Sequence, residues 1–313
     1  MAFKINDIVA ISDDRTMWPG GIQYINRVVY TQGYVMGGYR NSSPWKNVNR
    51  TVHATDVTTN LGDLMDKNGA YCTGGFDDIR AYSYATDDAF PGTVSYVSSF
   101  NMWVETGAAS PGNMSAARDD LGEFQNDGTR SWLYGGGSGN VDRHIFATNT
   151  FSNVTSGDTD NYQNSNQWGD NLTGFRSKGS QKMKFQTETW STMGNVVGGQ
   201  THSKSMPTKH GRIYIENNGN STAASDVYNY NVVTETNAAC SSFKPWTGGE
   251  TNYEIGQNHG YGLGHCGDGC QSNHSFKTYY HTDSHVAGGS VMEIKGHDGA
   301  SSGACGSRGW SGV

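Results

Sequence analysis

Charged residues are scarce in this chain of 313 residues. Lys, Arg, Asp and Glu together make up 16% of it, against roughly 25% in typical globular domains. The balance is acidic, with a formal net charge of −7. A surface of this sign repels phosphate groups and anionic lipid. We therefore expect no nucleic-acid partner.

Long apolar runs are also missing. No stretch of the sequence approaches the roughly 20 apolar residues that cross a bilayer, so we expect no insertion into a membrane. The segment Met1–Asp7 lacks the apolar core of about 7–15 residues that a secretory signal carries. We therefore expect no signal peptide.

Cysteines are few and unevenly spread, and their odd number, five, does not suggest a disulfide framework. Two thiols and two imidazoles lie within the ten residues 265–274, namely His265, Cys266, Cys270 and His274. Zinc takes such ligands tetrahedrally, so a structural zinc site is one interpretation. A Cys266–Cys270 disulfide is a second, and free thiols are a third. Because a single Cys-x₃-Cys pair is a weak zinc signal, we expect free thiols and no cofactor.

Glycine and aromatic residues are abundant, with 43 Gly, 17 Tyr and 8 Trp. Glycine adopts the positive φ angles that tight turns need, and Tyr, Trp and Thr fit the pleated surface of a sheet. Apolar and polar residues alternate in segments 79–84, 182–185 and 227–230, which indicates half-buried strands. The composition and these patterns predict an all-β fold.

Two landmarks alternate along the chain. The first is an aromatic residue followed closely by glycine, and its glycines are Gly37, Gly38, Gly74, Gly75, Gly135, Gly136, Gly174 and Gly264. The second is a Thr-acid or Thr-Asn pair, found at 55–56, 86–87, 148–149, 187–188, 234–235 and 282–283. Repeats of about 40–50 residues have the size of one propeller blade. The pattern therefore predicts a single β-propeller, in which ring closure removes exposed sheet edges and these glycines are structural.

We count six units between residues 33 and 296, with boundaries near 33–68, 69–128, 129–170, 171–210, 211–258 and 259–296. The second unit is the longest, and we expect an insertion around Tyr96–Val104. Segments 1–32 and 297–313 carry further strand-like or closing sequence. If they pair, the ring has seven blades and otherwise six; segment 1–32 is alternatively a docking segment.

Acidic pairs are candidates for catalysis, since glycan cleavage uses two carboxylates. They lie at 77–78, 87–88 and 119–120. Adjacent acids on a strand point to opposite faces, so they suit turns better than an active site. We therefore expect no catalytic residue and no enzymatic activity.

Tryptophans are candidates for binding. Trp45, Trp103, Trp168, Trp246 and Trp310 lie near loops rich in Asn, Ser and Gly, a composition that suits stacking on sugar rings. We take Trp45, Trp168 and Trp246 as the candidate contacts to a glycan or receptor. Packing between blades is the alternative for each of them.

Three segments carry a more specific pattern. They supply a tryptophan at 100–103, an arginine-bearing strand at 114–118 and an aromatic-diglycine at 132–136. Together they resemble a kelch repeat. The resemblance implies a propeller scaffold, and a scaffold of this kind names a fold and not a function.

A narrower resemblance covers more of the chain. Segments 54–64 and 69–75 are similar to repeats in tail and fibre-like virion proteins of marine cyanobacterial phages, and segments 2–6 and 13–15 resemble the start of structural proteins from such phages. This implies a virion structural protein of the tail, a fibre or the capsid surface, assembled in the host cytoplasm. Its partners would be other virion subunits and a glycan or protein of the host surface.

Two other classes of function remain open. One is a cellular kelch-like module that binds a protein or a glycan. The other is a propeller enzyme, which would bring carboxylates or a metal together in the central channel.

Overall fold

The structure is a computed structural model and describes 21 short ranges of the chain. These are residues 32–37, 39–40, 43–44, 46–52, 55–77, 79–86, 94–118, 121–125, 129–135, 138–154, 167–169, 173–176, 181–193, 205–207, 212–216, 227–231, 234–240, 252–255, 259–263, 275–279 and 281–287. The expected terminal segments 1–32 and 297–313 lie outside them, apart from Gln32.

The described residues form small antiparallel sheets and contain no helix, which confirms the all-β class. Sheet 1 holds β1 (Gln32–Met36), β4 (Asn47–Val52) and β5 (Val57–Asp63). Sheet 2 holds β6 (Gly69–Phe76), β7 (Arg80–Thr86), β8 (Val94–Asn101), β9 (Thr106–Ala108) and β10 (Asn113–Arg118). Sheet 3 holds β11 (Leu121–Gln125), β12 (Arg130–Gly135), β13 (Ser138–Ile145) and β14 (Thr150–Val154).

The second half of the chain repeats the four-stranded plan. Sheet 4 holds β15 (Gln167–Gly169), β16 (Thr173–Arg176), β17 (Gln181–Lys184) and β18 (Thr189–Thr192). Sheet 5 holds β19 (Ser205–Pro207), β20 (Arg212–Glu216), β21 (Val227–Asn231) and β22 (Thr236–Ala239). Sheet 6 holds β23 (Asn252–Ile255), β24 (His259–Leu263), β25 (Ser275–Tyr279) and β26 (Ser284–Ala287). A separate two-stranded ribbon joins β2 (Tyr39–Arg40) and β3 (Ser43–Pro44).

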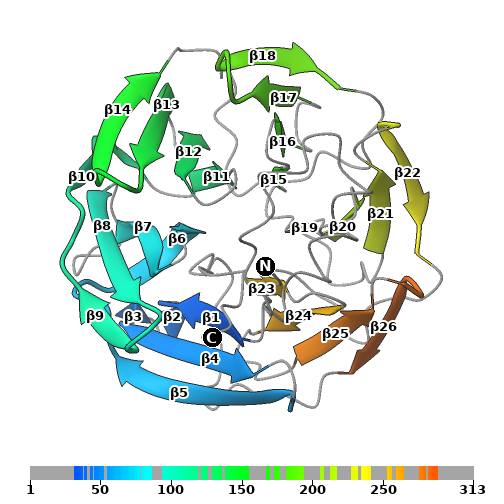
Figure 1. The fold of residues 1–313 in the computed structure, drawn as a ribbon, viewed down its shortest axis with the longest axis horizontal. Coiled ribbons are helices and arrows are strands. Elements are labelled where there is room, and N and C mark those ends of the chain that lie inside the picture. The colour runs from blue at the N-terminus through cyan, green and yellow to red at the C-terminus, as the bar shows by residue number, and fades with distance from the viewer. Residues whose placement is uncertain are drawn as a thin grey trace, which may run out of the picture.

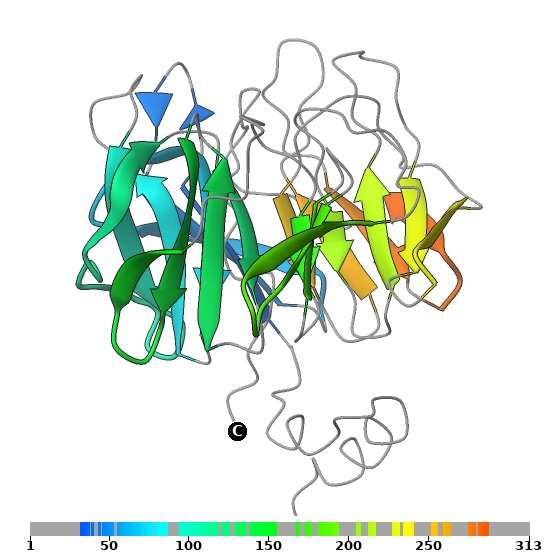
Figure 2. The same cartoon turned by 90° about the horizontal axis from the view of Figure 1, so that it is seen from above.

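The six sheets follow one another around a common centre, from sheet 1 in blue to sheet 6 in orange (Figure 1). Strands β6, β11, β15, β19 and β23 lie toward the centre, and the last strand of each sheet lies at the rim. Neighbouring inner strands contact one another in chain order, and β23 also contacts β1. Seen after a turn of 90°, the strands of sheets 2 and 3 stand upright beside each other (Figure 2).

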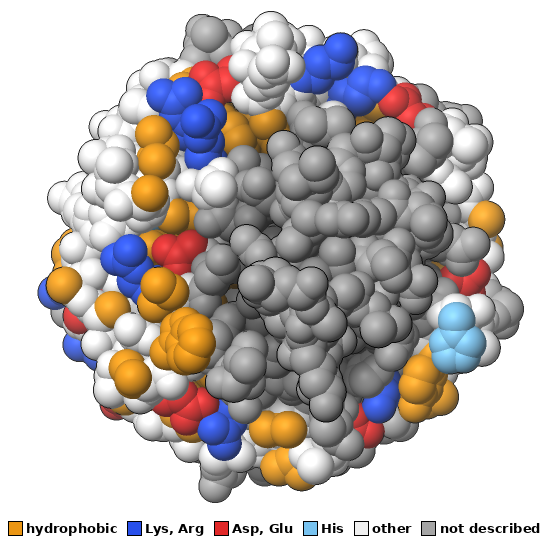
Figure 3. All heavy atoms as spheres, viewed as in Figure 1, with side chains coloured by type: hydrophobic (Ala, Val, Ile, Leu, Met, Phe, Trp, Pro, Cys, Tyr) orange, Lys and Arg blue, Asp and Glu red, His pale blue; other side chains and the backbone are white. Residues whose placement is uncertain are grey.

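The rim of the molecule carries charged and hydrophobic side chains intermixed (Figure 3). The described part of the chain contains no helix long and apolar enough to cross a membrane.

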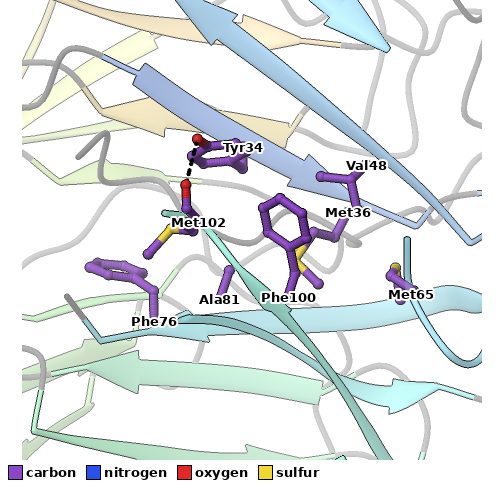
Figure 4. Close-up of a cluster of buried hydrophobic side chains, with 8 residues drawn as sticks. All are labelled: Tyr34, Met36, Val48, Met65, Phe76, Ala81, Phe100 and Met102. Carbon is purple, nitrogen blue, oxygen red and sulfur yellow. Dashed lines mark hydrogen bonds between the residues drawn. The ribbon is translucent and has the colours of Figure 1, made fainter. Parts of the chain in front are cut away.

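The core lies between neighbouring sheets. Between sheets 1 and 2, the ring of Tyr34 faces Phe100 with a centroid distance of 5.3 Å, and its hydroxyl donates to the carbonyl of Met102 (Figure 4). The buried cluster around this contact comprises Tyr34, Met36, Val48, Met65, Phe76, Ala81, Phe100 and Met102. Burying a large apolar side chain stabilises a fold by roughly 1.5–3 kcal/mol. Each sheet therefore depends on its neighbour for its stability.

The same arrangement recurs between the following sheets. Between sheets 2 and 3 the cluster contains Tyr82, Tyr84, Val97, Met114, Leu121, Leu133 and Phe146. Between sheets 3 and 4 it contains Trp132, Tyr134, Val141, Val154, Met183 and Phe185. In the latter, the rings of Trp132 and Phe185 stack with a centroid distance of 4.2 Å. Strand β12 is buried from Ser131 to Gly135, because sheets cover both of its faces.

Sheets 3 to 6 begin one strand earlier than the predicted units. The reason is that the aromatic-glycine landmark marks the second strand of a four-stranded sheet, as at Gly135 on β12 and Gly174 on β16. Gly74 and Gly75 are different, because they lie on the inner strand β6. Gly37 follows β1 with a φ of 72°. The predicted positions Gly38, Gly136 and Gly264 lie outside the described residues.

The expected insertion at Tyr96–Val104 is wrong. This segment forms most of β8 and the turn after it, and β8 pairs with β7 from Val97 to Asn101. The additional length of sheet 2 lies in β10, which pairs with the start of β8, while β9 pairs with its end.

Candidate functional site

Among the described residues, six that are not glycine have a positive φ. Five of them lie in the turn between the last two strands of a sheet, and Glu105 of the five-stranded sheet 2 lies in the turn between β8 and β9. The six are Asp56, Glu105, Asn149, Glu188, Glu235 and Asp283, with φ between 50° and 56°. We call them the turn acceptors. Their spacing is 49, 44, 39, 47 and 48 residues. This conformation costs a residue with a Cβ roughly 1–2 kcal/mol, so the side chains must supply something that glycine lacks.

The turn acceptors bind the preceding sheet. Glu105 of sheet 2 accepts hydrogen bonds from Arg50 at 2.7 and 2.9 Å and from the hydroxyl of Tyr34 at 3.2 Å, both in sheet 1. Glu188 of sheet 4 accepts from Arg143 at 2.9 Å and from Trp132 Nε1 at 3.0 Å, both in sheet 3. In each case one strained carboxylate holds two strands of its neighbour.

The other turns make equivalent contacts. Lys182 pairs with Glu235, Asn229 donates to Asp283 at 3.1 Å, and the hydroxyl of Tyr82 donates to Asn149 at 3.3 Å. The last contact of the series joins sheet 6 to sheet 1, since Lys277 Nζ lies 2.8 and 3.0 Å from the carboxylate oxygens of Asp56. The same type of bond therefore links every sheet to the next one.

The strand register explains how one acceptor reaches two donors. An aromatic residue on one strand lies directly opposite a polar residue on the next strand in all six sheets. These pairs are Tyr34 with Arg50, Tyr82 with Ser99, Trp132 with Arg143, Phe175 with Lys182, Tyr214 with Asn229 and Tyr261 with Lys277. Where the polar residue is a cation the turn acceptor is an acid, and where it is Ser99 the acceptor is the uncharged Asn149. A cation thus meets an acid at four of these six junctions, while the uncharged Asn229 meets the acid Asp283.

The sequence located five of the six turns correctly. In sheet 2 the equivalent turn holds Glu105 and not the predicted Thr86-Asp87 pair, of which Thr86 ends β7 and Asp87 lies outside the described residues. Sequence reasoning missed Glu105 because Val104 replaces the threonine of the landmark. An acidic residue followed directly by threonine, here Glu105-Thr106, is the signal that would have identified this turn.

A buried ion pair adds to the junction of sheets 2 and 3. Arg118 and Asp142 have no exposed side-chain surface, and Arg118 donates to Asp142 Oδ2 at 2.9 Å. The same oxygen accepts from the backbone amide of Ser115 at 3.1 Å. Arg118 belongs to the segment that resembles a kelch repeat, and in this structure it ties β10 to β13.

A chain of polar side chains crosses the same junction. Ser131 donates to the carboxylate of Glu123, Tyr84 donates to Ser131 at 3.3 Å, and the hydroxyl of Tyr84 lies 3.0 Å from Nδ1 of His144. Burial, together with the charge of Arg80, lowers the pKa of His144 to about 3. The imidazole is therefore neutral at neutral pH. It stacks on Phe151 at a centroid distance of 4.2 Å, as a packed core group does.

Among the predicted acidic pairs, Asp77 belongs to a turn. Its Oδ1 accepts from the amides of Ile79 at 2.8 Å and Arg80 at 2.5 Å, and its Oδ2 accepts from the hydroxyl of Tyr82 at 2.9 Å. These bonds close the connection between β6 and β7. The other acids of the three pairs lie outside the described residues.

An exposed apolar cluster lies at the same end of sheet 2. It consists of Ile79, Trp103 and Val104, which are 48%, 50% and 64% exposed. The carbonyl of Ile79 accepts from the amide of Met102, the residue before Trp103, at 2.8 Å. Large apolar side chains exposed at one end of a sheet are a candidate contact site.

The predicted site residues fall mostly outside the described part. His265, Cys266, Cys270, His274, Trp45 and Trp246 all lie outside it. Trp168 lies on β15, where it pairs in register with Phe175. Among the described residues, no group of three or more His, Cys, Asp and Glu side chains is placed to hold a metal ion.

Comparison with protein-family models and with curated proteins finds no match for this chain.

Proposed function

We propose that the chain forms a β-propeller and serves as a structural component of a phage virion, on its tail, a fibre or the capsid surface. The observation that carries the propeller is the bond between Lys277 and Asp56, which joins residues 221 positions apart. It repeats, between the last sheet and the first, the type of contact that links the other sheets. A ring of this kind leaves few exposed sheet edges.

The virion assignment is supported by where the phage resemblance falls. Segment 54–64 contains the turn acceptor Asp56 and all of β5. Segment 69–75 forms most of β6 and contains Gly75. A Cβ built on Gly75 would lie 2.7 Å from Ser131 Oγ and 2.8 Å from the hydroxyl of Tyr84. Both segments therefore contain residues at which one sheet contacts another. The resemblance thus includes residues that hold the sheets together.

The repeated bonds between neighbouring sheets suit a structural component of a virion. Each sheet is tied to its neighbour by a partly buried ion pair or hydrogen bond, with side chains 12–34% exposed in the ion pairs of the turn acceptors. Such pairs stabilise more than fully exposed ones. Bonds of this kind between sheets hold the surface residues of the protein in fixed positions. This lowers the entropic cost of docking to neighbouring subunits.

Cryo-electron microscopy of intact virions tests this proposal. The virions would come from the phage that carries the gene, and peptide mass spectrometry of the same preparation would show whether the chain is present. We expect a ring-shaped density of about this mass at a repeated position. Purified virions that lack the chain would contradict the virion proposal.

The second candidate is a kelch-like interaction module of a cell. It is supported by the exposed side chains of Ile79, Trp103 and Val104, because an interaction module needs exposed apolar surface for its partner. Absence of the chain from virions, together with saturable binding of a cellular protein or a glycan by the purified chain, would select this alternative.

A further inference from the structure

We propose that the inner edge of sheet 1, along β1, is covered by residues 300–304 of this same chain, which add a fourth strand to the sheet. We call these residues the closing segment, and they lie outside the described residues. The inference rests on the propeller proposed above and not on the virion assignment. It makes the ring one of six sheets, without a seventh.

Strand β1 occupies the place that the second strand has in sheets 3 to 6. Tyr34 on β1 lies opposite Arg50, as Trp132 on β12 lies opposite Arg143. The turn acceptor Asp56 lies between the last two strands of its sheet, as the turn acceptors of sheets 3 to 6 do. In those four sheets the second strand pairs on both sides, with an inner strand and with the third strand. Among the described residues, β1 pairs with β4 alone.

The inner edge of β1 is shielded from water. Residues 33–37 are all buried, and Tyr34, Val35 and Met36 have at most 1% of their surface exposed. In an antiparallel pair the backbone groups of a strand point alternately toward and away from the partner, so β4 pairs with only half of those of β1. More than about 90% of buried backbone N–H and C=O groups have hydrogen-bond partners. A further strand along β1 meets this requirement.

The spacing of the sheets identifies the segment. Sheets 4, 5 and 6 each begin with an inner strand 13 positions after the end of the preceding sheet. The three steps run from Val154 to Gln167, from Thr192 to Ser205 and from Ala239 to Asn252. Sheet 6 ends at Ala287, so the same step leads to Ala300. Because the inner strands of sheets 3 to 6 have three to five residues, the segment is 300–304.

The composition of the closing segment suits an inner strand. Its sequence is Ala-Ser-Ser-Gly-Ala, without a large side chain. Inner strands lie toward the centre of the molecule (Figure 1), and they leave little room there. On the inner strand β6, a Cβ on Gly75 would lie 2.7 Å from Ser131 Oγ. Small residues allow strands to approach closely at such places.

The residues directly before β1 are the nearest alternative, and they lack a turn. Between the inner and second strands of sheets 3 to 6, the connecting residues 126–129, 170–172, 208–211 and 256–258 all include Gly, Asn or Asp. These residue types favour the tight turn of a hairpin. Residues 28–31, in front of β1, are Val-Val-Tyr-Thr. The sequence therefore favours a strand from elsewhere in the chain over a hairpin at this point.

Amide hydrogen exchange of the purified full chain tests the inference. A strand paired inside a sheet exchanges slowly, because its amides must open before they exchange. After correction for intrinsic rates, we expect the closing segment to exchange about a hundredfold more slowly than residues 307–313. Exchange of both segments at the same corrected rate would overturn the inference. It would leave the proposed ring standing, since the bond from Lys277 to Asp56 does not involve the closing segment.

Proline substitutions show whether the partner of the closing segment is β1. Alternate amides of a strand point toward one neighbour, so one of Ser302→Pro and Gly303→Pro removes a donor to β1. In that variant we expect exchange of β1 to rise at least about tenfold, while β16, the second strand of sheet 4, stays unchanged. Gly309→Pro, outside the segment, is the matched control.

Unchanged exchange of β1 in both variants would contradict the pairing. A second copy of the chain is the other possible source of the strand. Protection of β1 that is lost on dilution, as a dimer separates into monomers in sedimentation, would assign the strand to that second copy and would overturn the inference as well.

Discussion

At the residue scale, the turn acceptors show why strained conformations persist in this molecule. Glu188 has a φ of 52° and accepts hydrogen bonds from Arg143 and Trp132. The conformation costs roughly 1–2 kcal/mol, whereas a hydrogen bond to a charged group contributes about 1.5–3 kcal/mol. The side-chain bonds exceed the strain, so an acid is retained where glycine would be easiest to accommodate.

Two substitutions of Glu188 separate strain from bonding. Glu188→Ala keeps the strain and loses both bonds, so we expect it to lower the free energy of unfolding by about 2–3 kcal/mol. Glu188→Gly loses the same bonds but relieves the strain, and it should be about 1 kcal/mol more stable than the alanine variant. Urea denaturation measures both. A glycine variant more stable than the parent protein would show that the bonds of the carboxylate contribute less than the strain costs.

Asn149→Gly is the matched control for these variants. Asn149 is uncharged, and the hydroxyl of Tyr82 reaches it at the longer distance of 3.3 Å. We expect a loss below about 1 kcal/mol, because the strain relieved offsets a weak bond.

His144 makes the fold sensitive to acid. Burial lowers the pKa of His144 to about 3 in the folded protein. In the unfolded chain the pKa of this residue is about 6.5. Below pH 6.5 the unfolded chain therefore binds a proton that the folded protein does not take up until about pH 3. Stability is full above pH 6.5 and falls by about 1.4 kcal/mol per pH unit as the pH decreases toward 3.

The expected loss from His144 between about pH 7 and pH 5 is about 2 kcal/mol. Urea denaturation at the two pH values measures it, and His144→Phe should remove that part of the difference. Because carboxylates also titrate in acid, the comparison between the two proteins is the decisive quantity. An unchanged difference in the phenylalanine variant would contradict the assignment.

At the scale of elements, two glycines set how closely sheets approach. A Cβ on Gly107 of β9 would lie 2.4 Å from the backbone oxygen of Leu64, which follows β5. A Cβ on Gly75 would meet the side-chain oxygens of Ser131, Tyr84 and Glu123 at 2.7–3.2 Å. We expect Gly107→Ala to destabilise by about 2–3 kcal/mol, and Gly75→Ala by less, because side chains rotate away more easily than backbone moves. Thermal unfolding of both variants measures the order, and the reverse order would contradict it.

The sequence predicted the strands and most of the turns, because both depend on local chemistry. Alternation in 182–185 and 227–230 predicted parts of β17 and β21. A Thr-acid or Thr-Asn pair predicted the turns that hold the residues of positive φ in five sheets. The same pattern did not find the equivalent turn of sheet 2, because the pair Thr86-Asp87 lies at the end of β7 and the turn with positive φ holds Glu105. A polar pair near the end of a strand resembles a turn wherever it occurs.

The residues that pair between sheets could not be predicted from the sequence alone. Arg50 and Glu105 are 55 positions apart, and Arg143 and Glu188 are 45 apart. Their partnership depends on the register that places Trp132 opposite Arg143, and on which edge of each sheet faces its neighbour. Neither is fixed by a pattern within one strand. The exposure of Trp103 is of the same kind, because it depends on what the rest of the fold covers.

At the scale of the whole molecule, the decisive question is whether six sheets form a closed ring or an open row. In an open row of repeats each unit contacts only its neighbours, and the end units have one interface each. In a ring the first and last sheets share an interface too. The contact of β23 with β1 and the bond from Lys277 to Asp56 lie at that interface.

A double-mutant cycle at this interface tests ring closure in solution. Lys277→Met keeps the length of the side chain, and Asp56→Asn keeps a residue that tolerates positive φ, so the two changes remove charge with little effect on shape. Lys277 is 12% exposed and Asp56 is 34% exposed, which makes the pair partly buried. In a closed ring we expect a coupling energy of about 1 kcal/mol from urea denaturation of the four proteins.

The same cycle on Lys182→Met and Glu235→Gln is the control, because that pair joins two consecutive sheets and forms in an open row as well. Equal coupling at both sites, within about 0.5 kcal/mol, would mean that the last sheet binds the first as firmly as any sheet binds the next. Coupling at the control site alone would mean that the sheets form a row with free ends. The propeller, and the fixed surface on which docking to a virion depends, would then be lost together.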